Sequence, residues 1–151
     1  ATNRGGFYIG RYEAGTETER TAETDPLTTP LVQANKYPYV NITREQAKEQ
    51  AESMYNVNTS IKATTELISS YAWDTALNFI CQTNTKGYEL ATTTDDAYGN
   101  IGTGDNGKTL TGGYTEDCYS NIYDFLGNYR ELTTEYSNAV NDSRNFLLLC
   151  W

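Results

Sequence analysis

The stretch NIYDFLGNYRELTTEYS, residues 121–137, carries the densest pattern in this chain of 151 residues. It combines aromatic side chains, a Gly127-Asn128 pair and three acidic groups. The Gly-Asn pair is typical of a turn with one left-handed residue, and we expect Glu131 to fix a loop by hydrogen bonds. Three large side chains are expected in the core: Tyr123, Leu126 and Leu132. The stretch therefore predicts a segment that mainly holds a fold.

Composition excludes several functional classes. The formal net charge is −9, and a field of that sign repels phosphate, so we expect no nucleic-acid partner. The absence of histidine removes Ser-His-Asp and Cys-His catalysis and histidine-based metal sites. The longest apolar tract, Phe146–Trp151, is far shorter than the roughly 20 residues of a membrane span, so we expect a core strand there and no membrane insertion. This length suits one domain covering 1–151, which could also be the C-terminal domain of a longer protein.

Two segments are predicted to be helices. In NITREQAKEQAESM, Thr43 and a glutamine three residues later form a capping box, which begins a helix from about Arg44 to Met54. In SSYAWDTALNFICQT, apolar residues recur at helical spacing after a cap at Ser69 or Ser70. These two patterns place both helices in the middle of the chain.

The remaining sequence is interpreted as strand and loop. The opening GGFYIGRYEAG, Gly5–Gly15, alternates as a strand does. From Thr83 to Asp117 a stretch rich in Gly, Thr, Asn and Asp predicts a long irregular region, in which we interpret Glu116-Asp117 as solvated charges. The order of strand, two helices, long loop region and strands favours an α+β fold with both termini in one sheet.

The 121–137 stretch resembles the signature of the formylglycine-generating enzyme (sulfatase-modifying factor) family, commonly Gly-Leu-Tyr-Asp-Met-x-Gly-Asn-Val-x-Glu-Trp-Thr. Leu132 stands where that family usually has Trp. The opening GGFYIGRYEAG is similar to the family's first strand, and SSYAWDTALNFI to its Thr-Glu-Ala-Glu-Trp-Glu helix. The matching signature positions are Ile122, Tyr123, Asp124, Leu126, Gly127, Asn128, Glu131 and Thr133. The resemblance implies a C-type-lectin-like fold with a small antiparallel sheet, two helices and long irregular loops.

The resemblance does not extend to the family's catalytic segment. Its enzymes use a pair of cysteines after an Arg-Gly-Gly-Ser-type stretch, and soft thiolates of that kind bind copper(I). This chain has no such stretch, so we expect no catalytic residues, and we interpret Cys81, Cys118 and Cys150 as buried, inert thiols. A copper-dependent oxidase acting on a cysteine peptide is an alternative that requires Cys118 and Cys150 to lie close together.

Non-catalytic relatives of this fold are the better comparison. They include variable proteins of diversity-generating retroelements and related phage-tail or bacterial surface proteins. They imply a ligand-binding display domain on a virion or bacterial cell surface, whose partner is a protein or glycan receptor. Tyrosine and asparagine, which dominate binding loops, recur from 119 to 145. The expected contact residues are Tyr119, Tyr129, Tyr136, Asn138, Asn141 and Asp142. A purely structural virion or adhesin domain is a second alternative.

The resemblance also implies a calcium site. In the family, oxygen ligands near the Gly-Asn-x-x-Glu turn can hold calcium. Here Asn128 would supply a side-chain carbonyl and Glu131 a carboxylate, both of which are ligands that calcium accepts. No other cofactor is expected.

Overall fold

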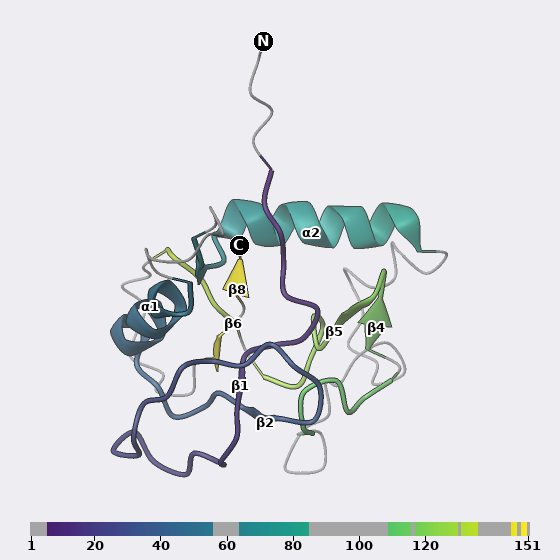
Figure 1. Ribbon diagram of the computed structural model, residues 1–151. Helices are drawn as coiled ribbons and strands as arrows, with labels where there is room; N and C mark the ends of the chain where they lie inside the picture. The colour runs from purple at the N-terminus through teal and green to yellow at the C-terminus, as the bar shows by residue number, and fades with distance from the viewer. Residues whose placement is uncertain are drawn as a thin grey trace.

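The computed structural model describes residues 6–55, 64–84, 109–115, 117–129 and 131–135, and the backbone of 146–147 and 149–150. Within these ranges the chain forms two helices and four small strand pairs (Figure 1). The elements in chain order are β1 Gly15–Thr16, β2 Tyr37–Pro38, α1 Arg44–Ser53, β3 Glu66–Leu67, α2 Ser70–Thr83, β4 Cys118–Tyr119, β5 Ile122–Tyr123, β6 Glu131–Leu132, β7 Phe146–Leu147 and β8 Leu149–Cys150. This mixture confirms the α+β class.

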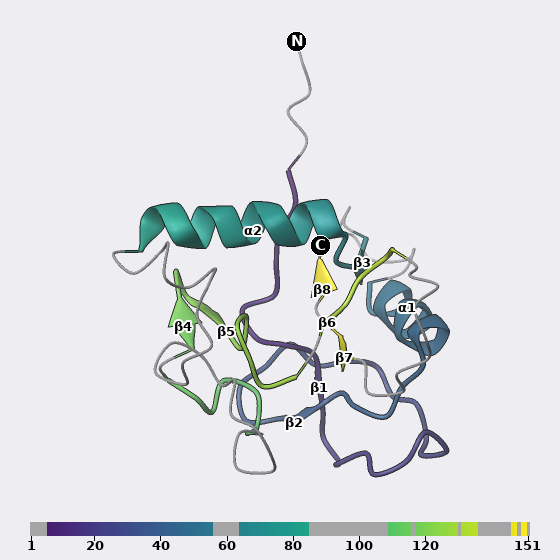
Figure 2. The ribbon, with the colours of Figure 1, turned by 180° about the vertical axis from the view of Figure 1, so that it is seen from behind.

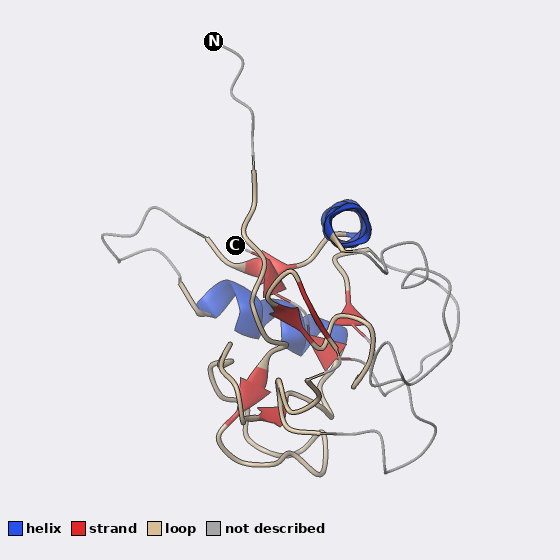
Figure 3. Ribbon diagram, turned by 90° about the vertical axis from the view of Figure 1, so that its right-hand side faces the viewer, coloured by secondary structure: helices blue, strands red, loops and turns tan. Residues whose placement is uncertain are grey.

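Each strand pair is two residues long. β1 pairs with β2, β3 with β8 and β4 with β5, all antiparallel, whereas β6 and β7 run parallel. Within the described residues, therefore, the N-terminal strand pairs with β2 and the last strand with β3. The single sheet that we expected to join both termini is not among these pairs, although the chain start passes close to β8 (Figures 1 and 3).

The opening segment is not the long strand that its alternation predicts. Only Ile9 makes a bridge before β1, and the chain bends at Arg11 and Tyr12. The carbonyl of Arg11 accepts a hydrogen bond from the N–H of Tyr123 at 2.8 Å, and the Tyr12 ring stacks on the Tyr123 ring with centroids 5.0 Å apart. These contacts with β5 turn the chain inward, so the next residue, Glu13, is buried.

Both helices begin where the sequence predicts. In α1 the Thr43 hydroxyl accepts from the Gln46 N–H, and the Gln46 side chain accepts from the Thr43 N–H, which is the expected capping box. In α2 the Ser69 hydroxyl accepts from the Ala72 N–H. α2 lies across one side of the molecule above the strand pairs, as two opposite views agree (Figures 1 and 2). Neither helix in the described ranges is long and apolar enough to cross a bilayer.

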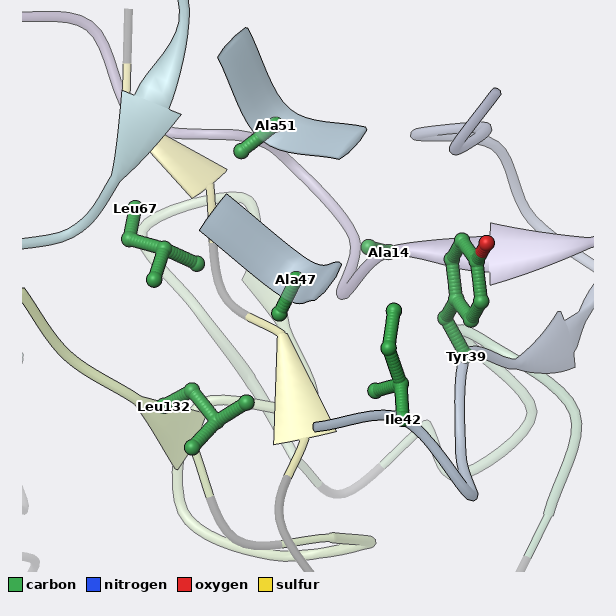
Figure 4. Packing of buried hydrophobic residues seen from close by; sticks show 7 residues of the cluster. All are labelled: Ala14, Tyr39, Ile42, Ala47, Ala51, Leu67 and Leu132. Atoms are coloured by element: carbon green, nitrogen blue, oxygen red, sulfur yellow. The ribbon is translucent and has the colours of Figure 1, made fainter. Parts of the chain in front are cut away.

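The core consists of two clusters that flank the signature. The first packs α1 against β3, β6 and the chain around β1 (Figure 4). Its buried members are Ala14, Tyr39, Ile42, Ala47, Ala51, Leu67 and Leu132. The second packs the inner face of α2 on the β4–β5 hairpin, with Trp73 stacked on Phe125 at 5.1 Å between centroids. Its buried members are Ile68, Ala76, Ile80, Tyr119, Ile122 and Phe125. The predicted core positions Leu132 and Leu126 lie in or against these clusters.

A buried arginine organises the loop between β1 and α1. Arg20 is 4% exposed, and its guanidinium donates to four carbonyls at 2.7–3.0 Å. It also lies over the Tyr39 ring, 5.4 Å from the centroid. These four acceptors are the carbonyls of Asp25, Pro26, Val40 and Asn41, and a fifth, that of Ala22, lies at 3.5 Å. The irregular loop between β1 and α1 is thus held by hydrogen bonds from one side chain, where a sheet would use backbone hydrogen bonds between strands.

Candidate functional site

A tight hairpin begins the site. β4 and β5 are joined by Ser120 and Asn121, whose φ values of 51° and 69° are those of a type I′ turn. The N–H of Asp124, directly after β5, donates to the carbonyl of Asp117, directly before β4, at 3.2 Å. The hairpin therefore brings two acidic residues to its open end.

Four carboxyl groups gather at this open end. Asp117 and Asp124 come from the hairpin, Glu13 from the bend after Ile9, and Glu131 from β6. Asp117 and Asp124 are 0% exposed and Glu13 is 6% exposed. Lys36 forms an ion pair with Glu17, and Lys48 with Glu52, elsewhere in the molecule. The cluster therefore brings four carboxyl groups together at positions largely removed from water.

Hydrogen bonds from the cluster hold the segment Thr109–Gly113. Asp124 adopts a left-handed φ of 58°, and its Oδ2 accepts from the Gly112 N–H at 2.6 Å. Asn128 is also left-handed, with φ 61°, as the Gly-Asn pair predicts. Its Oδ1 accepts from the Thr109 N–H at 2.9 Å, and its Nδ2 donates to the Thr109 carbonyl at 3.1 Å and to Glu13 Oε1.

The pKa values of three of these carboxyl groups are shifted toward their protonated forms. Burial, followed by the charge of Asp124, raises the pKa of Glu13 well above its usual value. Burial raises the pKa of Asp124 to about 6, against the lowering effect of the Gly112 hydrogen bond. Although the Glu131 residue is only half-buried as a whole, removal of its carboxyl from water raises that pKa to about 8. Asp124 Oδ1 is buried with no hydrogen-bond partner among the described residues.

The implied calcium ligands do not fit calcium as they are arranged. Asn128 turns its NH2 group, not its oxygen, toward the Glu13 carboxyl, and its oxygen already accepts from Thr109. Calcium requires oxygen atoms that converge on one point. In the described ranges, no three acidic or thiol side chains converge in a way that could hold a metal ion. Asn128 is therefore not oriented as a calcium ligand, and calcium at Glu131 stays a hypothesis.

The expected ligand-contact residues divide into three groups. Tyr119 is 7% exposed and belongs to the α2 cluster, so our placement of it outside the core was wrong. The two-residue turn of the hairpin aims its ring at α2, a geometry that the Tyr/Asn composition does not reveal. Tyr129 is half-buried beside the Gly-Asn turn. The remaining predicted contacts lie outside the described residues: Tyr136, Asn138, Asn141 and Asp142.

The cysteines are placed only in part. Cys81 and Cys118 are free thiols and half-buried, so they are less covered than we expected. The backbone of Cys150 lies in β8, paired with β3, while its side chain lies outside the described residues. A Cys118–Cys150 pair therefore stays a hypothesis.

Several residues of the site had no local signal. Asp117 was interpreted as a solvated loop charge, yet it is fully buried, since its side chain accepts from the Leu126 N–H at 3.3 Å within the hairpin end. Glu13 lies 115 residues from its partner Asn128. Thr109 and Gly112 take part through backbone atoms, which composition does not report. Asp124 and the Gly127-Asn128 pair of the signature were the parts that the sequence made detectable.

Comparisons with protein-family models, with curated proteins and with solved structures give no match to this chain.

Proposed function

We propose that this chain is a non-catalytic, ligand-binding display domain with a C-type-lectin-like, formylglycine-generating-enzyme-like fold. Its partner is a protein or glycan receptor, and its place is a phage tail or a bacterial cell surface. The signature residues serve this function indirectly, by fixing the loops that surround them.

One observation supports the proposal most directly. Of the residues on either side of 85–108, Asn84 is hydrogen-bonded to the turn of the β4–β5 hairpin and Thr109 to the Gly127-Asn128 turn. Asn84 Nδ2 donates to Ser120 Oγ at 3.1 Å, and Thr109 is held by Asn128. Thr83 Oγ1 adds a 2.7 Å hydrogen bond to the same Ser120 hydroxyl. Binding residues are commonly carried on connections whose ends are fixed by a rigid scaffold. In this proposal the ligand is held by the loops after Thr83, so residues 85–108 belong to the binding surface together with Tyr129 and the contacts after residue 135.

The burial and internal hydrogen bonds of the acidic side chains favour binding over catalysis. General acid–base residues must reach a substrate proton, within about 3 Å or through one water. Asp124 and Glu13 instead lie under the surface and accept hydrogen bonds from the chain's own Gly112 and Asn128. In this proposal, the raised pKa values of Asp124 and Glu13 therefore result from their burial in a structural role.

The proposal is tested by screening the purified domain against glycan arrays and bacterial surface proteins. A hit is then measured with a variant in which Tyr129, Tyr136, Asn138, Asn141 and Asp142 are replaced by alanine. Tyr71→Ala serves as the control, because Tyr71 is 84% exposed on α2 and is not among the proposed contacts. Loss of binding in the first variant alone supports the proposal. A flat screen would favour a structural domain, and cysteine-dependent copper(I) binding would favour the oxidase.

A further inference from the structure

The side chain of Asn128 connects three segments that are distant in sequence. Its amide lies edge to edge with the backbone of Thr109, accepting from the N–H at 2.9 Å and donating to the carbonyl at 3.1 Å. The same NH2 group donates to Oε1 of Glu13. One side chain thus joins the signature turn, the segment Thr109–Gly113 and the start of the chain.

The orientation of this amide is determined by its neighbours. Rotating the amide by 180° would place NH2 against the Thr109 N–H and oxygen against the Thr109 carbonyl. Both hydrogen bonds would then become like-to-like contacts, so only one orientation satisfies the backbone. In that orientation two donor hydrogens point away from the amide, one to Thr109 and one to Glu13. A cation between Asn128 and Glu13 would meet an N–H group in place of an oxygen.

We propose that the Asn128 amide is a metal-independent clamp, which occupies the structural position that the family resemblance gives to calcium. The clamp fixes Thr109–Gly113 against the signature turn. This inference goes beyond the proposed function, and it stands whether or not the domain binds a receptor.

A second set of hydrogen bonds holds the same segment. Gly112 is held from the same side by Asp124 Oδ2 at 2.6 Å. In addition, the Thr111 hydroxyl donates to the Gln33 carbonyl at 2.6 Å and accepts from the Lys36 N–H at 2.9 Å. The Thr111 side chain is 0% exposed. These hydrogen bonds join the segment both to the signature turn and to the chain around Gln33 and Lys36.

The first test compares wild-type protein in excess calcium chloride and in EGTA. Thermal unfolding gives the midpoint, and hydrogen exchange followed by NMR gives the opening of the Thr109 and Gly112 amides. The expected result is an unchanged midpoint and unchanged exchange rates at both amides. A calcium-dependent rise of the midpoint, or slower exchange at Thr109 in calcium, overturns the proposal. This comparison needs no variant, so it decides even where a substitution prevents folding.

The second test uses Asn128→Asp with Asn121→Asp as its matched control. Both asparagines have left-handed φ values, 61° and 69°, and Asn121 is exposed, so the two variants share the added charge and the backbone preference. Aspartate at 128 can still accept from the Thr109 N–H, but it loses both donor contacts and places a carboxylate beside Glu13. We expect the Thr109 amide to exchange at least about tenfold faster in Asn128→Asp, and at the wild-type rate in Asn121→Asp. Wild-type exchange at Thr109 in Asn128→Asp overturns the clamp.

Discussion

The carboxylate of Glu135 accepts a hydrogen bond from the backbone N–H of Ser70 at 2.9 Å, so the end of the signature segment covers the first turn of α2. One residue earlier, the Thr134 N–H donates to the Ile68 carbonyl at 3.0 Å. The guanidinium of Arg44, the first residue of α1, donates to the Thr134 carbonyl. The segment that resembles a family signature therefore contacts the N-terminal ends of both helices.

Replacing Glu135 by glutamine should weaken α2 slightly. Glutamine can still accept from Ser70, but it removes a negative charge that interacts favourably with the helix N-terminus. The Ser70 backbone hydrogen bond lowers the pKa of Glu135, so its contribution is present above the usual carboxyl pKa and is lost as the pH falls through the lowered value. We expect the thermal midpoint at pH 7 to fall by at most about 2–4 °C, and less in high salt. Glu49→Gln, on the exposed face of α1, is the control; an equal fall in both variants would contradict the assignment.

Arg20→Lys should be strongly destabilising, although it keeps the charge. A lysine ammonium cannot reproduce the planar fork that reaches four carbonyls, so several buried acceptors lose their donors. Each unsatisfied buried group costs about 1–3 kcal/mol, and we expect the free energy of unfolding in urea to fall by about 3 kcal/mol or more. Arg11→Lys is the matched control because the Arg11 side chain is exposed. A change below about 1 kcal/mol in Arg20→Lys would show that the guanidinium is dispensable.

The acidic cluster predicts that stability falls between weakly acidic and weakly alkaline pH. A carboxyl whose folded pKa is raised binds its proton more tightly in the folded state, so its stabilising effect is greatest below the usual value and is lost as the pH rises through the folded value. For Asp124 this loss of stability occurs between about pH 4 and about pH 6, and for Glu131 it extends to about pH 8. At about 1.4 kcal/mol per pKa unit, Asp124 alone corresponds to about 3 kcal/mol.

Asp124→Asn tests this pH dependence directly. Asparagine tolerates the left-handed φ of 58° and can still accept from the Gly112 N–H, but it does not ionise. Urea unfolding from pH 4 to pH 9 should show a smaller loss of stability above pH 4 than in wild type. Asp25→Asn is the control, because hydrogen bonds from Thr21 and Ala22 lower the Asp25 pKa and place its titration below this window. If the free energy of unfolding of Asp124→Asn falls with pH as steeply as that of wild type, Asp124 does not contribute to the pH dependence.

Local signals predicted the elements whose partners are close in sequence. The capping box of Thr43 and Gln46, the Ser69 cap and the left-handed Asn128 involve neighbours within a few residues, and each was confirmed. The prediction of a long opening strand was wrong because alternation of side chains between two faces presumes an extended backbone. Here the carbonyl of Arg11 is bound by Tyr123, more than a hundred residues later, and this contact bends the chain.

The candidate site was predictable only where the signature itself supplies it. Asp124 and Asn128 stand out in the sequence because a left-handed backbone favours these two residue types. Glu13 and Asp117 do not, because an acidic residue next to a tyrosine or in a polar stretch has the composition of a solvated surface. Their burial depends on hydrogen bonds from Asn128 and Leu126, contacts that only the folded chain creates.

Gly112→Ala should loosen the contact between Thr109–Gly113 and the start of the chain. Gly112 has a φ of +67°, and a Cβ there would lie 2.6 Å from Cε1 of Tyr12, the ring that stacks on Tyr123. Left-handed backbone costs a residue with a Cβ about 1–2 kcal/mol, and displacement of the ring adds to it, so we expect unfolding to become easier by about 2 kcal/mol or more. Gly6→Ala is the control, because a Cβ at Gly6 meets no atom within 4 Å. Urea unfolding measures both variants, and near-ultraviolet circular dichroism follows the tyrosine pair. If Gly112→Ala unfolds like Gly6→Ala with an unchanged aromatic signal, Tyr12 does not pack on this turn.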